Sequence, residues 1–348
     1  MVDRRPRRSP IGLTFASFSA LGLGAGIEAA TRAQSLGAAS FWVAETTGLE
    51  AFSTLAAVGS AVPGLSLGTG VLALQLRTPG VTAMGAASLQ AISPDADVLL
   101  GVGISSPAVV GRWHGAHYGD RPLDQMREYL TVLRQCLSGD KVDFDGDFYR
   151  VKGFRLGDRL GPVRDRETGE LVERPRPRII VAALNPKMLR LAGELADGVL
   201  LNYLPASHVA WSVEQVRAGG DATIHAYVHV GVTDVEPNRD HARRDLFSYI
   251  VVDAYARNFA RAGFADEVAE VRERHAAGDR DGAVAAVSDR MVDAIDILGD
   301  ADHIGASVQA YVDAGVEVPI VMPLPWGGDR MGVVRDTIDA SMAPGVVA

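Results

Sequence analysis

The chain alternates eight times between a short apolar run and a longer amphipathic stretch. The first pattern is typical of a buried strand and the second of a helix, and their alternation indicates parallel strands joined by crossover helices. Eight such units predict an α/β fold of the (β/α)8 TIM barrel type. The predicted strands are Ile11–Ser17, Phe41–Ala44, Leu65–Leu72, Val98–Val102, Ile179–Ala183, Gly198–Asn202, Ile224–Val230 and Val318–Pro323.

The predicted helices follow these strands one by one, and the fourth has the clearest pattern. Its apolar residues recur every three or four positions from Leu123 to Leu137, with Pro122 suited to its first position and Gly139 to its end. Asn185 is the expected N-cap of the fifth helix. The full set is Gly24–Leu36, Ala51–Ala61, Gly80–Ala91, Leu123–Leu137, Pro186–Ala196, Ser207–Arg217, Asn238–Ala262 and Asp329–Met342.

Two connections are longer than a minimal barrel requires. They follow strands four and seven and span about 105–178 and about 236–316. Within the first, Asp145 and Gly146 predict a hairpin turn. We expect both insertions at the mouth formed by the carboxyl ends of the strands, where barrel enzymes carry their sites. No second domain boundary is visible, so residues 1–348 are predicted to form one domain.

Composition excludes several classes of partner. The 34 basic and 43 acidic residues give a net charge of −9, which argues against binding to nucleic acid or to anionic membranes. The single cysteine, Cys136, fits a reducing, cytoplasmic compartment. The basic run Arg4–Arg8 before Ile11–Ala25 resembles a secretory leader, but Ser, Thr and Gly interrupt the apolar part. We therefore interpret that part as the first strand and the start of a helix.

Strand seven carries the most informative side chains. Its apolar residues alternate with His225, Tyr227 and His229. Because the apolar set should face the helices, these three side chains should point into the barrel, with His229 nearest the mouth. His229 is thus a candidate catalytic residue, and a hydrogen-bonded interior histidine is the alternative for it and for His225. The two histidines lie about 13 Å apart along a strand, so no shared metal ion is expected.

The ends of other strands offer further candidates. Glu45 ends strand two and is either a catalytic carboxylate or a cap of the next helix. Glycines at 68–71 and 101–103 would let the backbone approach a ligand closely. A helix starting after Asn185 would offer free N–H groups to a phosphate. The run Gly22–Gly26 has G-x-G-x-G spacing and does not follow its strand directly, so we reject a dinucleotide fingerprint there.

Several motifs together resemble the bacterial luciferase-like superfamily. They occur in the family's order between Ile11 and Asn202, whereas the C-terminal third is similar only in outline. The stretch Val181–Val199 is most similar to the branch that uses the deazaflavin coenzyme F420. The other motifs are Gly68–Val71 with Arg77–Pro79, Gly101–Gly103, Glu128–Leu130 with Leu133–Arg134, and Phe144–Tyr149.

The resemblance implies an F420-dependent oxidoreductase that transfers a hydride between C5 of the deazaflavin, seated in the barrel mouth, and a small organic substrate. It implies a homodimer, a cis peptide bond at Gly70–Val71, and Glu45 or His229 as the proton-transfer group. Relatives often have Gly-Gly where this chain has Leu184-Asn185 in the phosphate turn. The implied cofactor contacts are Phe15, Glu45, Thr46, Gly70, Val71, Gly103, Ile104, Ser105, Ala183, Leu184 and Asn185.

Two other functions remain open at this point. An FMN-dependent monooxygenase on the same barrel would use the same phosphate turn. A protein that binds a cofactor without turning it over is the third possibility. The substrate would be selected by the two insertions, which the sequence does not resolve into a pocket.

Overall fold

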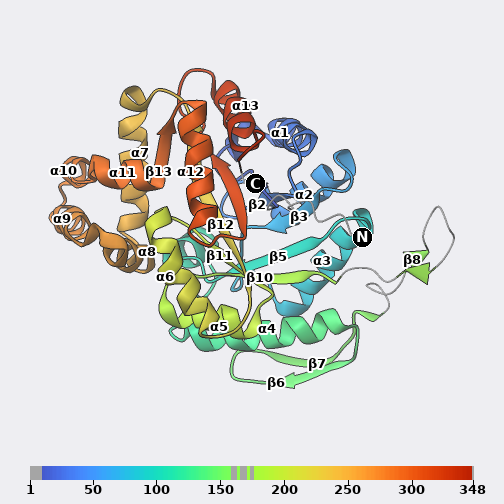
Figure 1. Cartoon of the computed structure of the whole chain (residues 1–348). Coiled ribbons are helices and arrows are strands. Elements are labelled where there is room, and N and C mark those ends of the chain that lie inside the picture. Colours follow the sequence, from blue (N-terminus) through green and yellow to red (C-terminus); the bar gives the residue numbers. More distant parts are fainter. Residues whose placement is uncertain (1–9, 158–162, 165–170, 173–175, 347–348) are drawn as a thin grey trace.

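The computed structural model describes residues 10–157, 163–164, 171–172 and 176–346 (Figure 1). Eight parallel strands form a closed ring, because β10 pairs with β5 and β14 pairs with β1. The predicted (β/α)8 barrel is therefore confirmed. In chain order its strands are β1 (Gly12–Thr14), β2 (Ser40–Val43), β3 (Ser66–Thr69), β5 (Val98–Gly103), β10 (Arg178–Ala182), β11 (Gly198–Leu201), β12 (Thr223–Val232) and β14 (Val318–Pro323).

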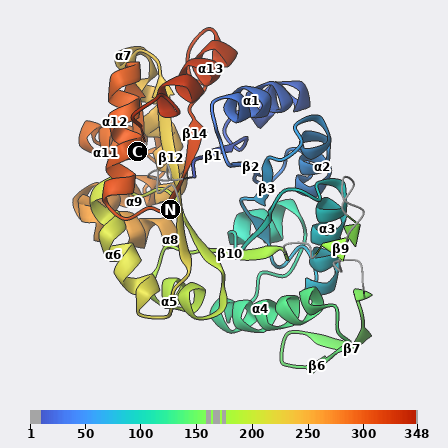
Figure 2. The ribbon, with the colours of Figure 1, turned by 45° about the vertical axis from the view of Figure 1, so that its right-hand side comes forward.

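Helices surround the strands in Figure 2. Pro122 opens the fourth of them and Gly139 ends it in the left-handed region at φ 86°, as expected. Its apolar stripe is buried, including Met126, Leu130 and Leu133. The helices of the outer ring are α1 (Leu23–Ser35), α2 (Ala51–Ala61), α3 (Pro79–Ile92), α4 (Pro122–Ser138), α5 (Pro186–Leu195), α6 (Ala206–Arg217), α12 (Ala301–Asp313) and α13 (Arg330–Ser341).

The predicted seventh helix, Asn238–Ala262, is wrong in extent and in place. The chain there forms α7 (Val235–Ile250) and α8 (Asp253–Phe259), and α12 packs on the barrel instead. The inserted helices bury their apolar faces in a second core of their own, so their periodicity could not reveal which surface they cover. After α8 the segment continues through a π turn (Ala260–Phe264), α9 (Ala265–Ala276), α10 (Arg280–Ala285), α11 (Asp289–Ile295) and β13 (Asp296–Gly299), which pairs with β12.

The predicted hairpin at Asp145-Gly146 is present, but it lies away from the mouth. It is formed by β6 (Val142–Asp145) and β7 (Arg150–Phe154). The Glu128 carboxylate of α4 accepts hydrogen bonds from the backbone N–H groups of Asp147 (3.0 Å) and Phe148 (2.9 Å). Figure 1 shows the hairpin on the outer side of α4. Because it follows a helix rather than a strand, it extends outside the barrel.

Of the first insertion, the part before α4 reaches the mouth. It includes the π turn Ala108–Trp113, and His114 and Tyr118 contact the loops after β2 and near β4 (Leu72–Ala73). The short strands β8 (Val163–Arg164) and β9 (Leu171–Val172) pair with each other. The rest of 158–175 and the basic run Arg4–Arg8 lie outside the described residues.

Large side chains fill the interior of the barrel. Tyr227 belongs to this interior cluster, and the His225 ring lies edge-on to Trp42, with the ring centroids 5.7 Å apart. The apolar residues of the same strand, Ile224 to Val230, lie in the outer core. The predicted orientation of strand seven is therefore correct. The cluster consists of Trp42, Leu99, Ile180, Leu200, Tyr227, Ile320 and Met322. None of the described helices has the length and apolarity of a membrane span.

Candidate active site

The centre of the mouth is built from backbone. The Gly70–Val71 peptide bond is cis, as the resemblance implied. The Gly70 carbonyl accepts a hydrogen bond from the Tyr227 hydroxyl (2.9 Å), which ties the end of β3 to β12. A Cβ on Gly103 would lie 2.7 Å from the Val71 side chain, so the glycine allows β5 to pass close to it. Beyond it, Ile104 is half-buried and Ser105 is exposed with φ 62°.

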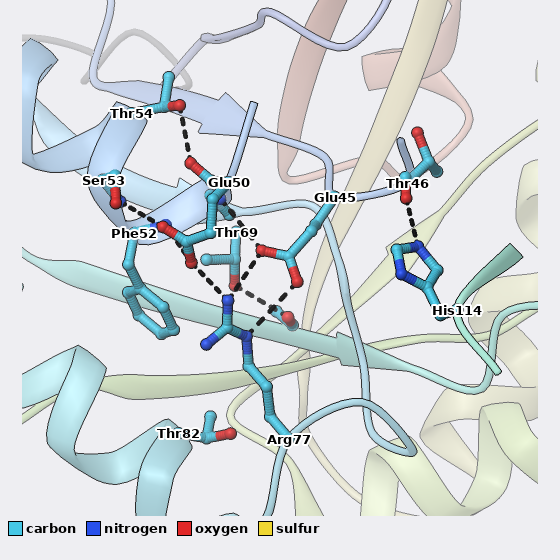
Figure 3. Close-up of polar contacts among 12 residues, drawn as sticks. Glu45, Thr46, Glu50, Phe52, Ser53, Thr54, Thr69, Arg77, Thr82 and His114 are labelled. Atoms are coloured by element: carbon cyan, nitrogen blue, oxygen red, sulfur yellow. Dashed lines mark hydrogen bonds and ion pairs between the residues drawn. The ribbon is translucent and has the colours of Figure 1, made fainter. Parts of the chain in front are cut away.

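Glu45 is held in an ion-pair network at one side of the mouth (Figure 3). One of its oxygens, Oε2, accepts from the Ala51 N–H at the start of α2 (3.1 Å) and pairs with Arg77 (3.1 Å). Arg77 also pairs with Glu50, which accepts from the Ser53 N–H (2.7 Å). Burial alone would raise the pKa of Glu50, but these N–H donors and Arg77 lower it overall. The contacts of Glu45 match the capping alternative.

Thr46 and Phe15 differ in their access to the mouth. Thr46 is exposed, and its carbonyl contacts Nε2 of His114 from the segment after β5 (Figure 3). The Phe15 side chain is fully buried, with its ring centroid 4.9 Å from that of Phe18 and 6.1 Å from that of Phe41. The implied cofactor contact by this side chain is therefore corrected: its ring faces the outer core, because β1 alternates sides at each residue.

Asn185 occupies the N-cap position of α5, as predicted, but its side chain makes no capping hydrogen bond. Its Nδ2 donates to the Ala254 carbonyl (3.2 Å) and its Oδ1 accepts from Arg261 (3.3 Å), so its side chain is drawn toward the inserted segment. The first N–H groups of α5 are left without that cap. Ala183, just before, is buried and Leu184 is half-buried. This correction leaves the end of β10 with helix N–H groups available to an anion.

Arg261 of the inserted segment contacts this helix start through Asn185, and Arg257 lies close to Arg261. The Arg261 guanidinium stacks over Trp211 at 4.6 Å, and its Nη1 has no hydrogen-bond partner. Burial and the charge of Arg257 lower the pKa of Arg261. Within the described ranges neither arginine forms an ion pair with a carboxylate. A cation without a carboxylate partner beside a helix N-terminus, with a second cation near it, favours an anionic ligand.

The resemblance also implied Lys187 and Arg190 on α5 as partners for the acidic tail of the cofactor, with a solvated helix face as the alternative. Arg190 donates to Gln215 on α6 (2.8 Å), and Lys187 is exposed. These contacts fit the solvated helix face that was the alternative for both.

His229 lies on β12, three strands around the ring from β2, and is enclosed, with 1 % exposure. Its Nδ1 lies 3.1 Å from Oδ1 of Asp296, and its Nε2 lies 2.8 Å from Oδ1 of Asn202. The ring packs edge-on against Tyr203 at 4.1 Å between centroids. Burial lowers the pKa of His229 and raises that of Asp296 to about 8. His225 is an interior histidine with Nδ1 at 3.2 Å from the Thr223 carbonyl.

Sequence reasoning missed the acids around His229. Asp296 follows the apolar end of α11 and begins β13, and Asp245 lies on α7, where it accepts from the Tyr203 hydroxyl (2.8 Å). An acid within the run Ile295-Asp296-Ile297-Leu298 is a signal that could have been noticed. Its partner could not, because 67 residues separate Asp296 from His229.

The sequence of this chain is similar to those of known proteins. The family model for luciferase-like monooxygenases matches residues 14–317. The chain belongs to this family. A Mycobacterium tuberculosis protein whose name gives it, provisionally, as a coenzyme F420-dependent oxidoreductase is 29% identical and aligns over 84% of this chain and 89% of its own length. The 5,10-methylenetetrahydromethanopterin reductase of Methanolobus tindarius is also 29% identical, over 82% and 85%.

Solved structures support the fold. The coenzyme F420-dependent tetrahydromethanopterin reductase of Methanopyrus kandleri superposes with a TM-score of 0.74 at 20% identity, covering 96% of this chain and 97% of that one. An F420-dependent secondary alcohol dehydrogenase gives 0.68 at 16% identity, over 96% and 99%. The family member described here is thus an enzyme on a luciferase-like TIM barrel.

Proposed function

We propose that this protein is a coenzyme F420-dependent oxidoreductase acting on a small organic substrate. The observation that carries the proposal is the start of α5, where Arg261 contacts Asn185 without a carboxylate partner among the described residues and Arg257 lies close enough to Arg261 to lower its pKa. F420 carries a phosphodiester and a glutamate tail, so its charge complements this end. The Mycobacterium tuberculosis relative named for F420 aligns over 84% of this chain.

The remaining residues fit the other half of the cofactor. When bound, the deazaflavin supplies or accepts a hydride at C5. The residues at the ends of β2, β3 and β5 (Thr46, Gly70, Val71, Gly103, Ile104 and Ser105) would seat its ring, and Ala183, Leu184 and Asn185 would position the phosphate. Oxygen donors for a resident metal are not required in this scheme.

Of the two proton-transfer candidates, we favour His229. Both oxygens of Glu45 accept from Arg77, and a carboxylate held by a cation is a weak proton donor. His229 instead reaches the mouth through Asn202, which is half-buried at the end of β11. Proton delivery by a positioned histidine contributes about 10²–10⁴-fold to a rate.

A cofactor titration tests the proposal. The purified full chain is titrated with F420 and, separately, with FMN, and binding is followed by the change in cofactor fluorescence. We expect saturable binding of F420 and none of FMN. Saturable FMN binding with F420 ignored would overturn the proposal in favour of the FMN-dependent monooxygenase.

We also propose a homodimer in a reducing, cytoplasmic compartment. The exposed apolar side chains Val81 and Met84 on α3 offer a surface for a second copy, and the buried Cys136 has no disulfide partner. A metal ion, nucleic acid and a membrane are not part of the proposal.

A further inference from the structure

A group of three ionisable side chains lies where the inserted segment meets the barrel. His229 comes from β12, Asp296 from β13 and Asp245 from α7, and one polar atom of each lies within 4.8 Å of the others. His229 and Asp296 are enclosed, whereas Asp245 is half-buried at the edge. In the described part of the chain, no arginine or lysine pairs with either carboxylate. A proton, rather than a cationic side chain, must therefore reduce the negative charge of this buried group.

The hydrogen bonds show where the protons lie. Oδ1 of Asn202 accepts the backbone N–H of Tyr203 (2.9 Å), which identifies this atom as the amide oxygen. Nε2 of His229, 2.8 Å away, must then donate to it. Nδ1 of the same ring faces Oδ1 of Asp296, an acceptor when ionised, so a proton must lie between them. Burial disfavours separated charges, which places this proton on Asp296 and leaves the imidazole neutral.

Asp245 connects this pair to water. Its Oδ2 accepts from the Tyr203 hydroxyl, and it lies beside Asp296, whose Oδ2 has no hydrogen-bond partner among the described residues. Burial and the charge of Asp296 raise the pKa of Asp245. The other titratable groups around the pair are phenols: Tyr203 after β11, Tyr249 on α7, Tyr255 on α8 and Tyr311 on α12. Burial raises the pKa of all four, so they stay neutral.

We propose that Asp296 is a positioning residue that keeps His229 neutral with its proton on Nε2, directed toward the mouth through Asn202, and that Asp245 exchanges the pair's proton with water. The catalytic meaning of this arrangement rests on the proposed function. When Nε2 gives up its proton, the proton of Asp296 moves to Nδ1. The imidazole remains neutral and Asp296 becomes a carboxylate. When Nε2 takes up a proton again, the Nδ1 proton returns to Asp296, and Asp245 is the group through which Asp296 equilibrates with water.

Nuclear magnetic resonance of ring-labelled histidine tests the tautomer in the unmodified full chain without any cofactor. The His229 signals are assigned by their loss in His229→Gln. We expect a neutral ring with the proton on Nε2 from pH 6 to 8. A proton on Nδ1 alone, or an imidazolium at pH 7, would overturn the proposal.

Urea unfolding as a function of pH tests whether the folded chain holds a proton on Asp296. The raised pKa of Asp296 means that the folded chain holds a proton that the unfolded chain has lost, so this contribution to stability is lost as pH rises through about 8. The His229 effect has the opposite sign and changes the unfolding constant by only about twofold above pH 6.5. Between pH 6.5 and 8, the unfolding constant of the wild type should rise about 10-fold relative to that of Asp296→Asn.

Asp302→Asn is the matched control, because Asp302 is an exposed acid just after β13 and should keep the wild-type pH dependence. A wild-type slope in Asp296→Asn, or a stoichiometric divalent metal in the purified protein, would overturn the proposal. Neither measurement uses F420. A failure to bind F420 would therefore not affect the interpretation of these two measurements. The proposed function and the proposed protonation of the His229–Asp296 pair can be refuted independently.

Discussion

At the scale of single residues, ion pairs connect the segments that form the mouth next to β2. Arg77 bridges Glu45 and Glu50, and its side chain is 21% exposed (Figure 3). It joins the loop after β2 to the start of α2 and to the segment before α3. A half-buried cation with two carboxylate partners is stabilising mainly because its removal would leave those carboxylates unpaired.

Arg77→Met should therefore lower the free energy of unfolding by about 1–2 kcal/mol. This is less than the cost of breaking a fully buried ion pair, because Arg77 is partly exposed to solvent. Urea unfolding at pH 7 measures it. Arg150→Met is the control, because Arg150 and Asp145 form an exposed pair on the hairpin, at 82% and 83% exposure. That variant should change stability by less than about 0.5 kcal/mol. Equal effects of the two variants would refute the bridging role.

Arg261→Gln should weaken F420 binding about 10-fold, since one charged hydrogen bond contributes about 1.5–3 kcal/mol. The affinity is measured by the same fluorescence titration as for the wild type. Arg290→Gln is a close control, because Arg290 also stacks on an aromatic ring of the inserted segment, Phe264, but is paired with Glu267. An unchanged affinity in Arg261→Gln would remove this arginine from the cofactor site.

At the scale of elements, the size of the interior side chains limits which residues the neighbouring strands can carry. Gly68 on β3 lies against the Trp42 ring, and a Cβ there would come within 2.3 Å of it. The largest interior side chain therefore requires a glycine on the neighbouring strand. In helices the constraint differs: the exposed Gly24 of α1 has open space around its Cβ position.

Gly68→Ala should destabilise the fold by about 1–3 kcal/mol through overpacking. Gly24→Ala, the matched change on α1, should instead stabilise it by up to about 1 kcal/mol, because alanine favours a helix. Thermal and urea unfolding of both variants measure the difference. A Gly68→Ala protein as stable as the wild type would show that Trp42 can move.

At the scale of the whole molecule, exposed apolar side chains lie on the outer face of α3. Val81 and Met84 are 49% and 54% exposed, and Ile92 on the same helix is 43% exposed. Side chains of this kind, gathered on one helix, are typical of a surface that binds another protein. This is the surface to which the proposed homodimer assigns the second copy.

The double variant Val81→Asp, Met84→Asp should raise the dimer dissociation constant at least about 100-fold, since a charge buried at an interface costs several kcal/mol. Sedimentation equilibrium measures it. Leu36→Asp, on the exposed end of α1, controls for added charge and should leave the assembly unchanged. If the wild type is already a monomer at micromolar concentration, the homodimer proposal is wrong.

The sequence by itself determined the barrel, because local patterns record it. Alternation on strand seven set the direction of His225, Tyr227 and His229, and the stripe of α4 with Pro122 and Gly139 set that helix within a residue. The motifs also indicated the family and the location of the cis bond. The strand alternation and the helix stripe depend on neighbours a few positions apart, which periodicity reports directly, whereas the cis bond was implied only by the resemblance to the family.

Only the tertiary structure decided what surrounds those residues. It paired Glu45 with Arg77, turned the Phe15 ring into the outer core, drew Asn185 away from α5 toward Arg261, and placed Asp296 and Asp245 around His229. The sequence indicated a helical insertion, but neither the bounds of its helices nor the second core that they form. Contacts between residues dozens of positions apart depend on how elements pack, and no local pattern records that packing.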